Sequence, residues 1–194
     1  KSANPQKRKG KLLHLNINMD WLSAKGLPIL GLDISTTAVK LVELSDAGKG
    51  MLRVERYVIE PLPKDAVTDG NIANLDQVAE ALRTAWKNMG TRIKNVALAL
   101  PSSAVITKKI LAPASLKGLD LENQVETEAN QVIPFSLDEV NLDFQVLGPS
   151  PGSPDDVQIL LAAARKEKVE DRVAAVEAAG LKALIMDVES FATQ

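Results

Sequence analysis

Residues that can bind a phosphate and a hydrated metal ion are concentrated in the short segment GLDISTTAVKLVEL. Asp33 ends one apolar run and Lys40 begins the next. Three hydroxyl residues lie between them, Ser35, Thr36 and Thr37. A phosphate site on a strand hairpin needs turn N–H groups, hydroxyls, a cation for the phosphate oxygens and an acidic residue that holds Mg²⁺ through water. The segment supplies all of these, but Asp, Ser and Thr are also ordinary turn residues, so a hairpin without a ligand is the alternative.

Other phosphate, metal and nucleophile motifs are missing from the sequence. It contains neither a G-x-x-x-x-G-K-[ST] loop nor a G-x-G-x-x-G fingerprint, so P-loop and Rossmann nucleotide binding are not supported. The single histidine, His14, excludes metal clusters built on several histidines and gives no support to a Ser-His-Asp triad. The chain has no cysteine, which excludes a disulfide framework or a thiol nucleophile and fits a reducing compartment.

The charge is distributed unevenly along the chain. The net charge is −2, but the first residues include five basic ones, Lys1, Lys7, Arg8, Lys9 and Lys11. Without these five, 18 basic residues face 25 acidic ones, a net charge of −7. An acidic body with only 3% aromatic residues argues against nucleic acid as a partner. No apolar run approaches the roughly 20 residues that span a bilayer, so we expect a soluble chain.

We expect residues 1–26 to form a flexible basic leader or tail, because Lys, Arg, Asn, Pro and Gly surround one small apolar patch. A tail that contacts anionic lipids is the alternative. Met19 is a candidate native start, which would make the residues before it foreign to the protein. The sequence leaves these choices open.

The body of the chain begins with the pattern of a β-meander. Apolar residues predict three successive strands, over residues 29–34, 39–44 and 52–59, with a turn at 46–50. A helix over 75–89 follows, because apolar residues recur there at steps of three and four. We expect Asn74 to cap its start, with Gln77 in the position of the capping-box partner and Gly90 at its end. Trp86 lies on the apolar stripe and is predicted to be a core residue.

The second part of the chain predicts a small inserted unit, followed by a helix and a strand that belong to the main unit. The expected elements are strands at 95–100, 105–111, 140–147 and 157–164, a helix at 119–132, a Pro-rich loop at 149–154, a helix at 169–179 and a strand at 183–188. The pattern therefore predicts an α/β chain in which a strand-helix-strand-strand unit interrupts the main one.

This order of elements resembles the first half of the actin-like ATPase fold, which is ribonuclease H-like. The segment D-I-S-T-T-A-V-K is similar to the first phosphate hairpin of that fold, D-x-G-[ST]-x-x-x-K, with Asp33 and Lys40 in matching register. Ser35 stands where most members have glycine, a departure that argues against efficient ATP turnover. The resemblance implies a core subdomain of residues 27–101 and 166–194 and an inserted subdomain of 102–165.

Within this fold the sequence resembles the PilM family, cytoplasmic assembly proteins of type IV pili in which serine at position 35 is usual. The similarity covers about residues 27–194 and rests on separate blocks in the same order: GLDISTTAVKLVEL, YVIEPLPKDAV, SAVITKKI, EANQVIPFSLDEV, LLAAARKE and AAGLKALIMDVESFA. The resemblance implies a scaffold whose groove, between the two subdomains, takes the N-terminal cytoplasmic peptide of PilN. It also implies other pilus assembly proteins as partners. The protein would be cytoplasmic and would reach the inner membrane only through those partners. It leaves a homo-oligomer open.

The resemblance further implies that the full-length protein binds ATP with magnesium, through Asp33, Ser35, Thr36, Thr37 and Lys40, with Asp33 reaching the metal through water. Glu189 matches the carboxylate that positions water in bacterial actin relatives, and Asp187 is its near alternative. This sequence resembles only about half of such a chain, so we expect it to bind ATP weakly or not at all and to be inactive alone.

Three alternatives to the PilM scaffold stay open at this point. They are a division protein like FtsA, a secretion domain like GspL, and an active ATPase or sugar kinase of the same superfold. One further hypothesis concerns the tail, where LNIN, residues 15–18, is similar to the I-N-L-L-P pattern of PilN peptides and would occupy the groove.

Overall fold

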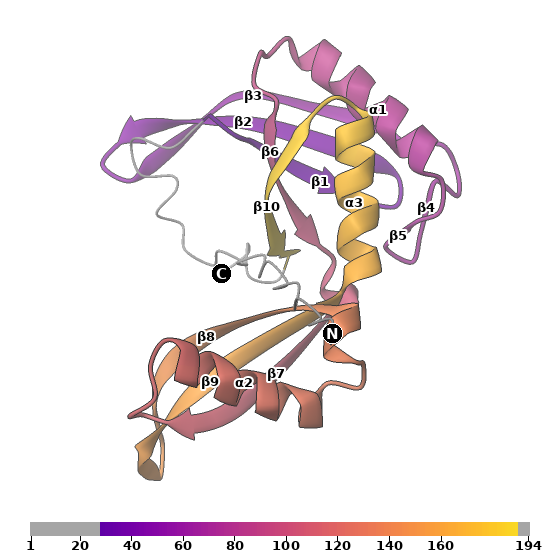
Figure 1. The fold of residues 1–194 in the computed structure, drawn as a ribbon. Coiled ribbons are helices and arrows are strands. Elements are labelled where there is room, and N and C mark those ends of the chain that lie inside the picture. Colours follow the sequence, from indigo (N-terminus) through magenta and orange to yellow (C-terminus); the bar gives the residue numbers. More distant parts are fainter. Residues whose placement is uncertain (1–27, 190–194) are drawn as a thin grey trace, which may run out of the picture.

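A computed structural model describes residues 28–189, so the predictions for residues 1–26, including His14, Met19 and the LNIN segment, lie outside the described residues. The described chain contains a mixed five-stranded main sheet and a three-stranded small sheet (Figure 1). The main sheet comprises β1 (Leu30–Ile34), β2 (Ala38–Gly48), β3 (Met51–Pro61), β6 (Asn95–Leu100) and β10 (Lys182–Val188). Their order is β10-β6-β1-β2-β3, and the meander β1-β2-β3 is antiparallel while β6 and β10 run parallel to β1.

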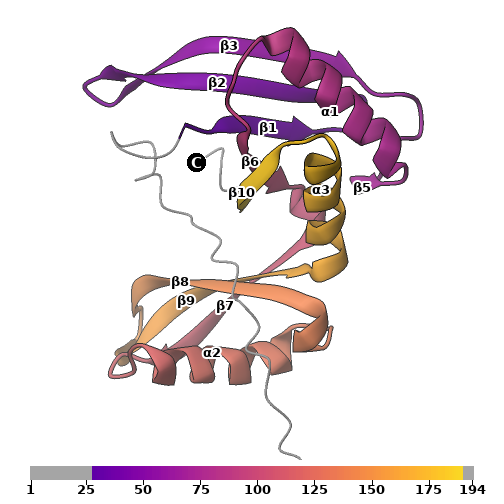
Figure 2. The same cartoon turned by 45° about the horizontal axis from the view of Figure 1, so that its top comes forward.

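One face of the main sheet carries the larger hydrophobic core. Helices α1 (Leu75–Met89) and α3 (Lys166–Ala178) pack against each other and over this face (Figures 1 and 2). Alternate residues of β1 and β6 point into this core, as the period of two in a strand requires. Trp86, predicted to be a core residue, is partly buried: it packs against the core and donates its Nε1–H to the Ile93 carbonyl at 2.7 Å.

Helix α1 begins and ends where the sequence predicts. The Asn74 side chain accepts a hydrogen bond from the backbone N–H of Gln77 at 3.1 Å, and Gly90 adopts a left-handed φ of 67°. The reciprocal half of the expected capping box is replaced by another contact. The Asn74 N–H donates to the Ala66 carbonyl at 3.1 Å instead, because the segment before the helix folds back against it.

The small sheet comprises β7 (Val105–Pro113), β8 (Val140–Ser150) and β9 (Ser153–Arg165) in the antiparallel order β7-β9-β8. Helix α2 (Leu119–Val132) packs against it and buries Val125 and Ala129 (Figure 2). The remaining elements are two-residue strands β4 (Val67–Thr68) and β5 (Asn71–Ile72), which form a hairpin, and short 3₁₀ helices at Ser102–Ala104 and Leu137–Glu139. Each sheet has its own cluster of buried apolar residues.

The predicted loop at 149–154 is wrong. Strands β8 and β9 run through this Pro-rich stretch and leave only a tight turn around Gly152, which has a φ of 93°. Proline is tolerated here because Pro149 lies on the edge strand β8. Pro154 comes before Asp156, the first residue of β9 that pairs with β7. The β4-β5 hairpin was not predicted either, because strands of two residues have no readable periodicity.

Candidate functional site

The hairpin between β1 and β2 brings the predicted phosphate-site residues together. Asp33 and Lys40 are direct cross-strand partners, and the Asp33 Oδ2 lies 2.8 Å from the Lys40 Nζ in a half-exposed ion pair. Ser35 closes the turn, since both its N–H and its hydroxyl donate to the Ala38 carbonyl, at 3.0 and 2.8 Å. The Ser35 hydroxyl hydrogen is therefore used within the hairpin.

A row of side chains crosses the main sheet at the level of Asp33, on the face opposite the core. The parallel register sets Asp33 level with Ala99 of β6, one residue beyond the Leu32–Leu98 pair, and Ala99 is paired with Asp187 of β10. Asp33 and Asp187 are thus two strands apart, about 10 Å between their backbones. Asp33, Ala99 and Asp187, here called the carboxylate row, therefore lie at one level across three strands.

The other candidate, Glu189, follows the end of β10 and is partly buried. Its charge acts on Arg172 of α3, together with those of Asp171 and Asp33. Burial lowers the pKa of Arg172, and these three carboxylates oppose that shift. The structure thus gives Glu189 and Asp187 different surroundings: Glu189 lies within the electrostatic reach of Arg172, whereas Asp187 belongs to the carboxylate row.

Burial raises the pKa of Asp187 above its ordinary value of 3.8, and a 2.7 Å hydrogen bond from the Val188 N–H opposes this shift. The folded chain therefore keeps this proton at pH values where the unfolded chain has lost it. The resulting stabilisation is complete below the unfolded pKa and is lost as the pH rises through the folded pKa. We expect Asp187→Asn to raise the melting temperature at neutral pH, because the amide carries no charge and keeps the acceptor for Val188.

This advantage of Asp187→Asn should shrink as the pH falls towards 4, where the wild-type carboxyl is increasingly protonated in the folded chain. Thermal unfolding of both proteins between pH 4 and 8 measures the difference. Asp155→Asn, at an exposed position of β9, is the control and should show no such trend. An equal melting temperature for Asp187→Asn and the wild type at every pH would contradict this prediction.

The hairpin turn also forms one wall of a cavity of about 540 Å³, here called the hairpin pocket. Thr36 and Thr37 line it, opposite the segment from Leu62 to Asp69, which contributes Lys64 and Thr68 among others. Thr37 is tied to this segment, since its carbonyl accepts the Leu62 N–H at 2.8 Å. The pocket therefore contains hydroxyls, one cation and the carboxylates of Asp65 and Asp69, but Asp33 and Lys40 are not part of its lining.

Direct metal coordination finds no support in the described residues, since no group of three or more His, Cys, Asp or Glu side chains among them could hold an ion. A magnesium ion that keeps most of its water shell needs only one or two carboxylates and the oxygens of a phosphate. Asp33 and Asp187 supply two carboxylates, which fits a magnesium ion that keeps most of its water shell.

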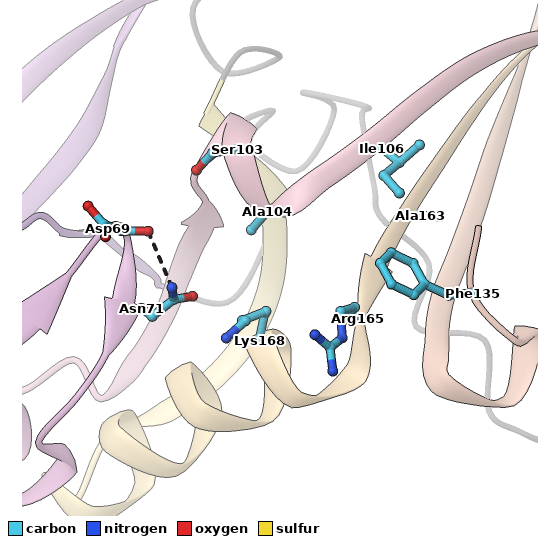
Figure 3. A pocket seen from close by; sticks show the side chains of 9 residues that line it. All are labelled: Asp69, Asn71, Ser103, Ala104, Ile106, Phe135, Ala163, Arg165 and Lys168. Atoms are coloured by element: carbon cyan, nitrogen blue, oxygen red, sulfur yellow. Dashed lines mark hydrogen bonds between the residues drawn. The ribbon is translucent and has the colours of Figure 1, made fainter. Parts of the chain in front are cut away.

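A second cavity, here called the junction groove, lies where the small sheet meets the main unit and has a volume of about 340 Å³ (Figure 3). Figure 3 shows Asp69 and Asn71 on one side, Ile106 and Phe135 on the other, and Lys168 between them. Its lining comes from separate parts of the chain: Asp69, Asn71, Ser103, Ala104, Ile106, Phe135, Ala163, Arg165 and Lys168. The groove thus combines an apolar wall with two cations and one carboxylate.

Two cations of the junction groove are held by neighbouring groups. Arg165 lies 5.5 Å from the centre of the Phe135 ring, and its Nη2 is 3.2 Å from the Glu167 carboxylate. Lys168 shares the same carboxylate at 3.3 Å. Sequence reasoning did not identify these residues, because a groove assembled from four separate stretches of the chain leaves no local pattern. The sequence did carry an indirect signal, because most of the lining falls within the blocks that resemble PilM: Ser103, Ala104, Ile106, Phe135, Ala163 and Arg165.

The main sheet order, the helices on one face and the inserted small sheet define the class of this chain: it is the first half of an actin-like fold. The sequence model of the type IV pilus assembly protein PilM matches residues 31–194. The chain belongs to this family.

Two solved structures are similar to this chain. One is a PilM–PilN type IV pilus biogenesis complex, with 33% sequence identity, a TM-score of 0.75, and coverage of 86% of this chain and 48% of that one. The other is the cytoplasmic domain of EpsL, an inner-membrane component of the type II secretion system of Vibrio cholerae, with 13% identity, a TM-score of 0.51, and coverage of 83% and 57%. The second match concerns the fold alone. Together they confirm the predicted fold class.

The chain spans about half the length of the matched PilM chain. Within residues 28–189, no helix has both the length and the apolar character needed to cross a bilayer.

Proposed function

We propose that this chain binds the N-terminal cytoplasmic peptide of PilN in the junction groove and thereby acts as a scaffold of the inner-membrane complex that assembles type IV pili. The observation that supports this most is the groove itself, an apolar and cationic cavity between the two sheets, in a chain that is 33% identical to a PilM solved together with PilN. In this proposal the chain is cytoplasmic and reaches the membrane through PilN and other assembly proteins.

The groove offers the contacts that an extended peptide needs. Ile106, Ala163 and the Phe135 ring can bury apolar side chains, and each buried methylene contributes roughly 0.8 kcal/mol. Lys168 and Arg165 can donate to backbone carbonyls, and Asp69 can accept from backbone N–H groups. A short segment with several aliphatic residues and polar main-chain groups, such as I-N-L-L-P, matches this combination.

We also propose that the family-length protein binds ATP with magnesium on the hairpin side. Thr36, Thr37 and the turn N–H groups would contact phosphate, Lys40 would neutralise it, and Asp33 with Asp187 would hold the hydrated metal. Ser35 would shape the turn, because its hydroxyl and N–H already bind Ala38. Bound magnesium would offset the charge of the phosphates. The part of the matched PilM chain that this chain does not cover would supply further contacts to ATP. We therefore expect this chain alone to bind ATP weakly.

Isothermal titration calorimetry with a peptide that carries the I-N-L-L-P pattern tests the peptide proposal. We expect binding to the wild-type chain and a loss of at least about tenfold in affinity for Ile106→Glu, which places a charge on the apolar wall. Leu111→Glu is the matched control, because Leu111 lies on the same strand β7 but is exposed and outside the groove lining. A folded chain that binds no peptide, or an equal loss in both variants, would contradict the proposal.

A further inference from the structure

Arg172 is the one charged residue among residues 28–189 that is almost completely buried, with 1% of its surface exposed. It lies on α3, on the buried face shared with Val169 and Val176. Its Nη2 donates to the Gly70 carbonyl at 2.7 Å and its Nη1 to the Lys168 carbonyl at 3.5 Å. Its Nε has no hydrogen-bond partner within the described part of the chain.

An arginine in this position is costly for folding. A buried guanidinium loses its hydration, and one N–H group here stays unsatisfied, whereas an apolar side chain of similar volume often fits such a site at no loss of stability. The shorter of its two hydrogen bonds is the bond to Gly70, 102 positions away in the chain. This bond ties helix α3 to the turn at Gly70.

Gly70 belongs to a turn that cannot hold its position alone. The turn joins β4 and β5, two strands of only two residues each, and a hairpin this short is not stable by itself. Asp69 and Gly70 both have left-handed φ values, 50° and 74°. These are the values of a type I′ turn, which Asp-Gly favours, but the two short strands still need support from their surroundings to hold the turn in place. Arg172 provides such support from the neighbouring helix.

The residues on both sides of Gly70, Asp69 and Asn71, line the junction groove. We propose that Arg172 is a positioning residue of this groove: through the Gly70 carbonyl it fixes the turn that forms one wall of the peptide site. This inference rests on the proposed peptide function and adds a residue that lies outside the groove lining. Because Asp69 also lines the hairpin pocket, the same bond fixes a wall that the two cavities share.

Peptide affinity in three variants tests this role. Arg172→Met keeps an unbranched apolar stem but removes the guanidinium and every donor. We expect it to weaken peptide binding roughly tenfold, as the loss of a charged hydrogen bond to the wall predicts. Arg172→Lys keeps one charged donor for Gly70 and should restore most of the affinity. Val176→Ala is the control for general destabilisation, since Val176 is fully buried on the same helix. It should lower the melting temperature and leave the affinity within about twofold.

Amide hydrogen exchange of the unliganded chain provides a measurement that does not depend on the peptide. Arg172→Met should speed exchange at the Ala73 N–H, which donates to the Ala66 carbonyl across the hairpin, without speeding exchange in the middle of α1. If the wild-type chain binds no peptide, the proposed function fails while this result still reports on the turn. Unchanged affinity in Arg172→Met, or an equal loss in Val176→Ala, would overturn the positioning role, as would unchanged exchange at Ala73.

Discussion

Replacing Leu161 with alanine is expected to lower the free energy of unfolding by about 3–5 kcal/mol, the largest effect of a single substitution predicted for this chain. Leu161 is fully buried on β9, the central strand of the small sheet, with Lys108 of β7 and Phe144 of β8 as its cross-strand neighbours. The side chain belongs to the same buried cluster as Val125 of α2. Alanine would leave a cavity between sheet and helix that this small core cannot close.

Urea unfolding of the wild type and of Leu161→Ala measures this loss. Leu111→Ala removes the same atoms from the neighbouring strand β7, where the leucine is 48% exposed, and should cost less than about 1 kcal/mol. A loss of similar size in both variants would mean that packing against α2 does not stabilise the small sheet. A second transition in the Leu161→Ala curve would show that the small sheet unfolds separately from the main one.

Gly31→Ala is expected to destabilise the chain by about 1–3 kcal/mol, although alanine usually favours folding over glycine. A Cβ at position 31 would lie 2.8 Å from the Cγ1 of Val42, its cross-strand partner on β2. The cost comes from this contact, because Gly31 is not among the glycines with positive φ. The β-branched side chain of Val42 has few other rotamers with which to move away.

A double-mutant cycle isolates this contact. Val42→Ala removes the methyl group in question, so the double variant Gly31→Ala, Val42→Ala should be destabilised by less than the sum of the single variants. Thermal and urea unfolding of the four proteins give the coupling energy. Strict additivity would show that the close approach of β1 and β2 at this level is not what excludes a side chain at position 31. The result bears on the hairpin site, because Asp33 lies on the same face two residues further along β1.

The local parts of the fold were predictable from the sequence because their causes are local. The alternation of apolar residues placed the strands on either side of the hairpin, and the spacing of Asp33 and Lys40 across that turn brought the two into register. Asn74 and Gly90 marked the ends of α1 because capping groups act within a few residues of the helix they end. The prediction of a loop at 149–154 failed, because prolines at these positions of the sheet allow strands β8 and β9 to continue up to a tight turn.

The carboxylate row was only partly predictable. Asp33 was recognised as a candidate from the hairpin motif, and Asp187 from the resemblance to actin-like proteins. Their relation depends on β6 lying between β1 and β10, which is a property of the sheet order. The same holds for Ser35. Its residue type suggested a phosphate contact, whereas the geometry of the turn directs its hydroxyl to Ala38.

By itself, the sequence determined the family, the α/β class, the order of the elements and the hairpin with its Asp33–Lys40 pair, because these follow from local periodicity, turn chemistry and short sequence blocks. Only the tertiary structure decided the junction groove, the Asp33–Asp187 row and the burial of Arg172. The physical reason is the same in each case: the contacts join segments that are distant in the chain, as Arg172 and Gly70 are. Such contacts depend on how helices and sheets pack, which no single stretch of sequence encodes.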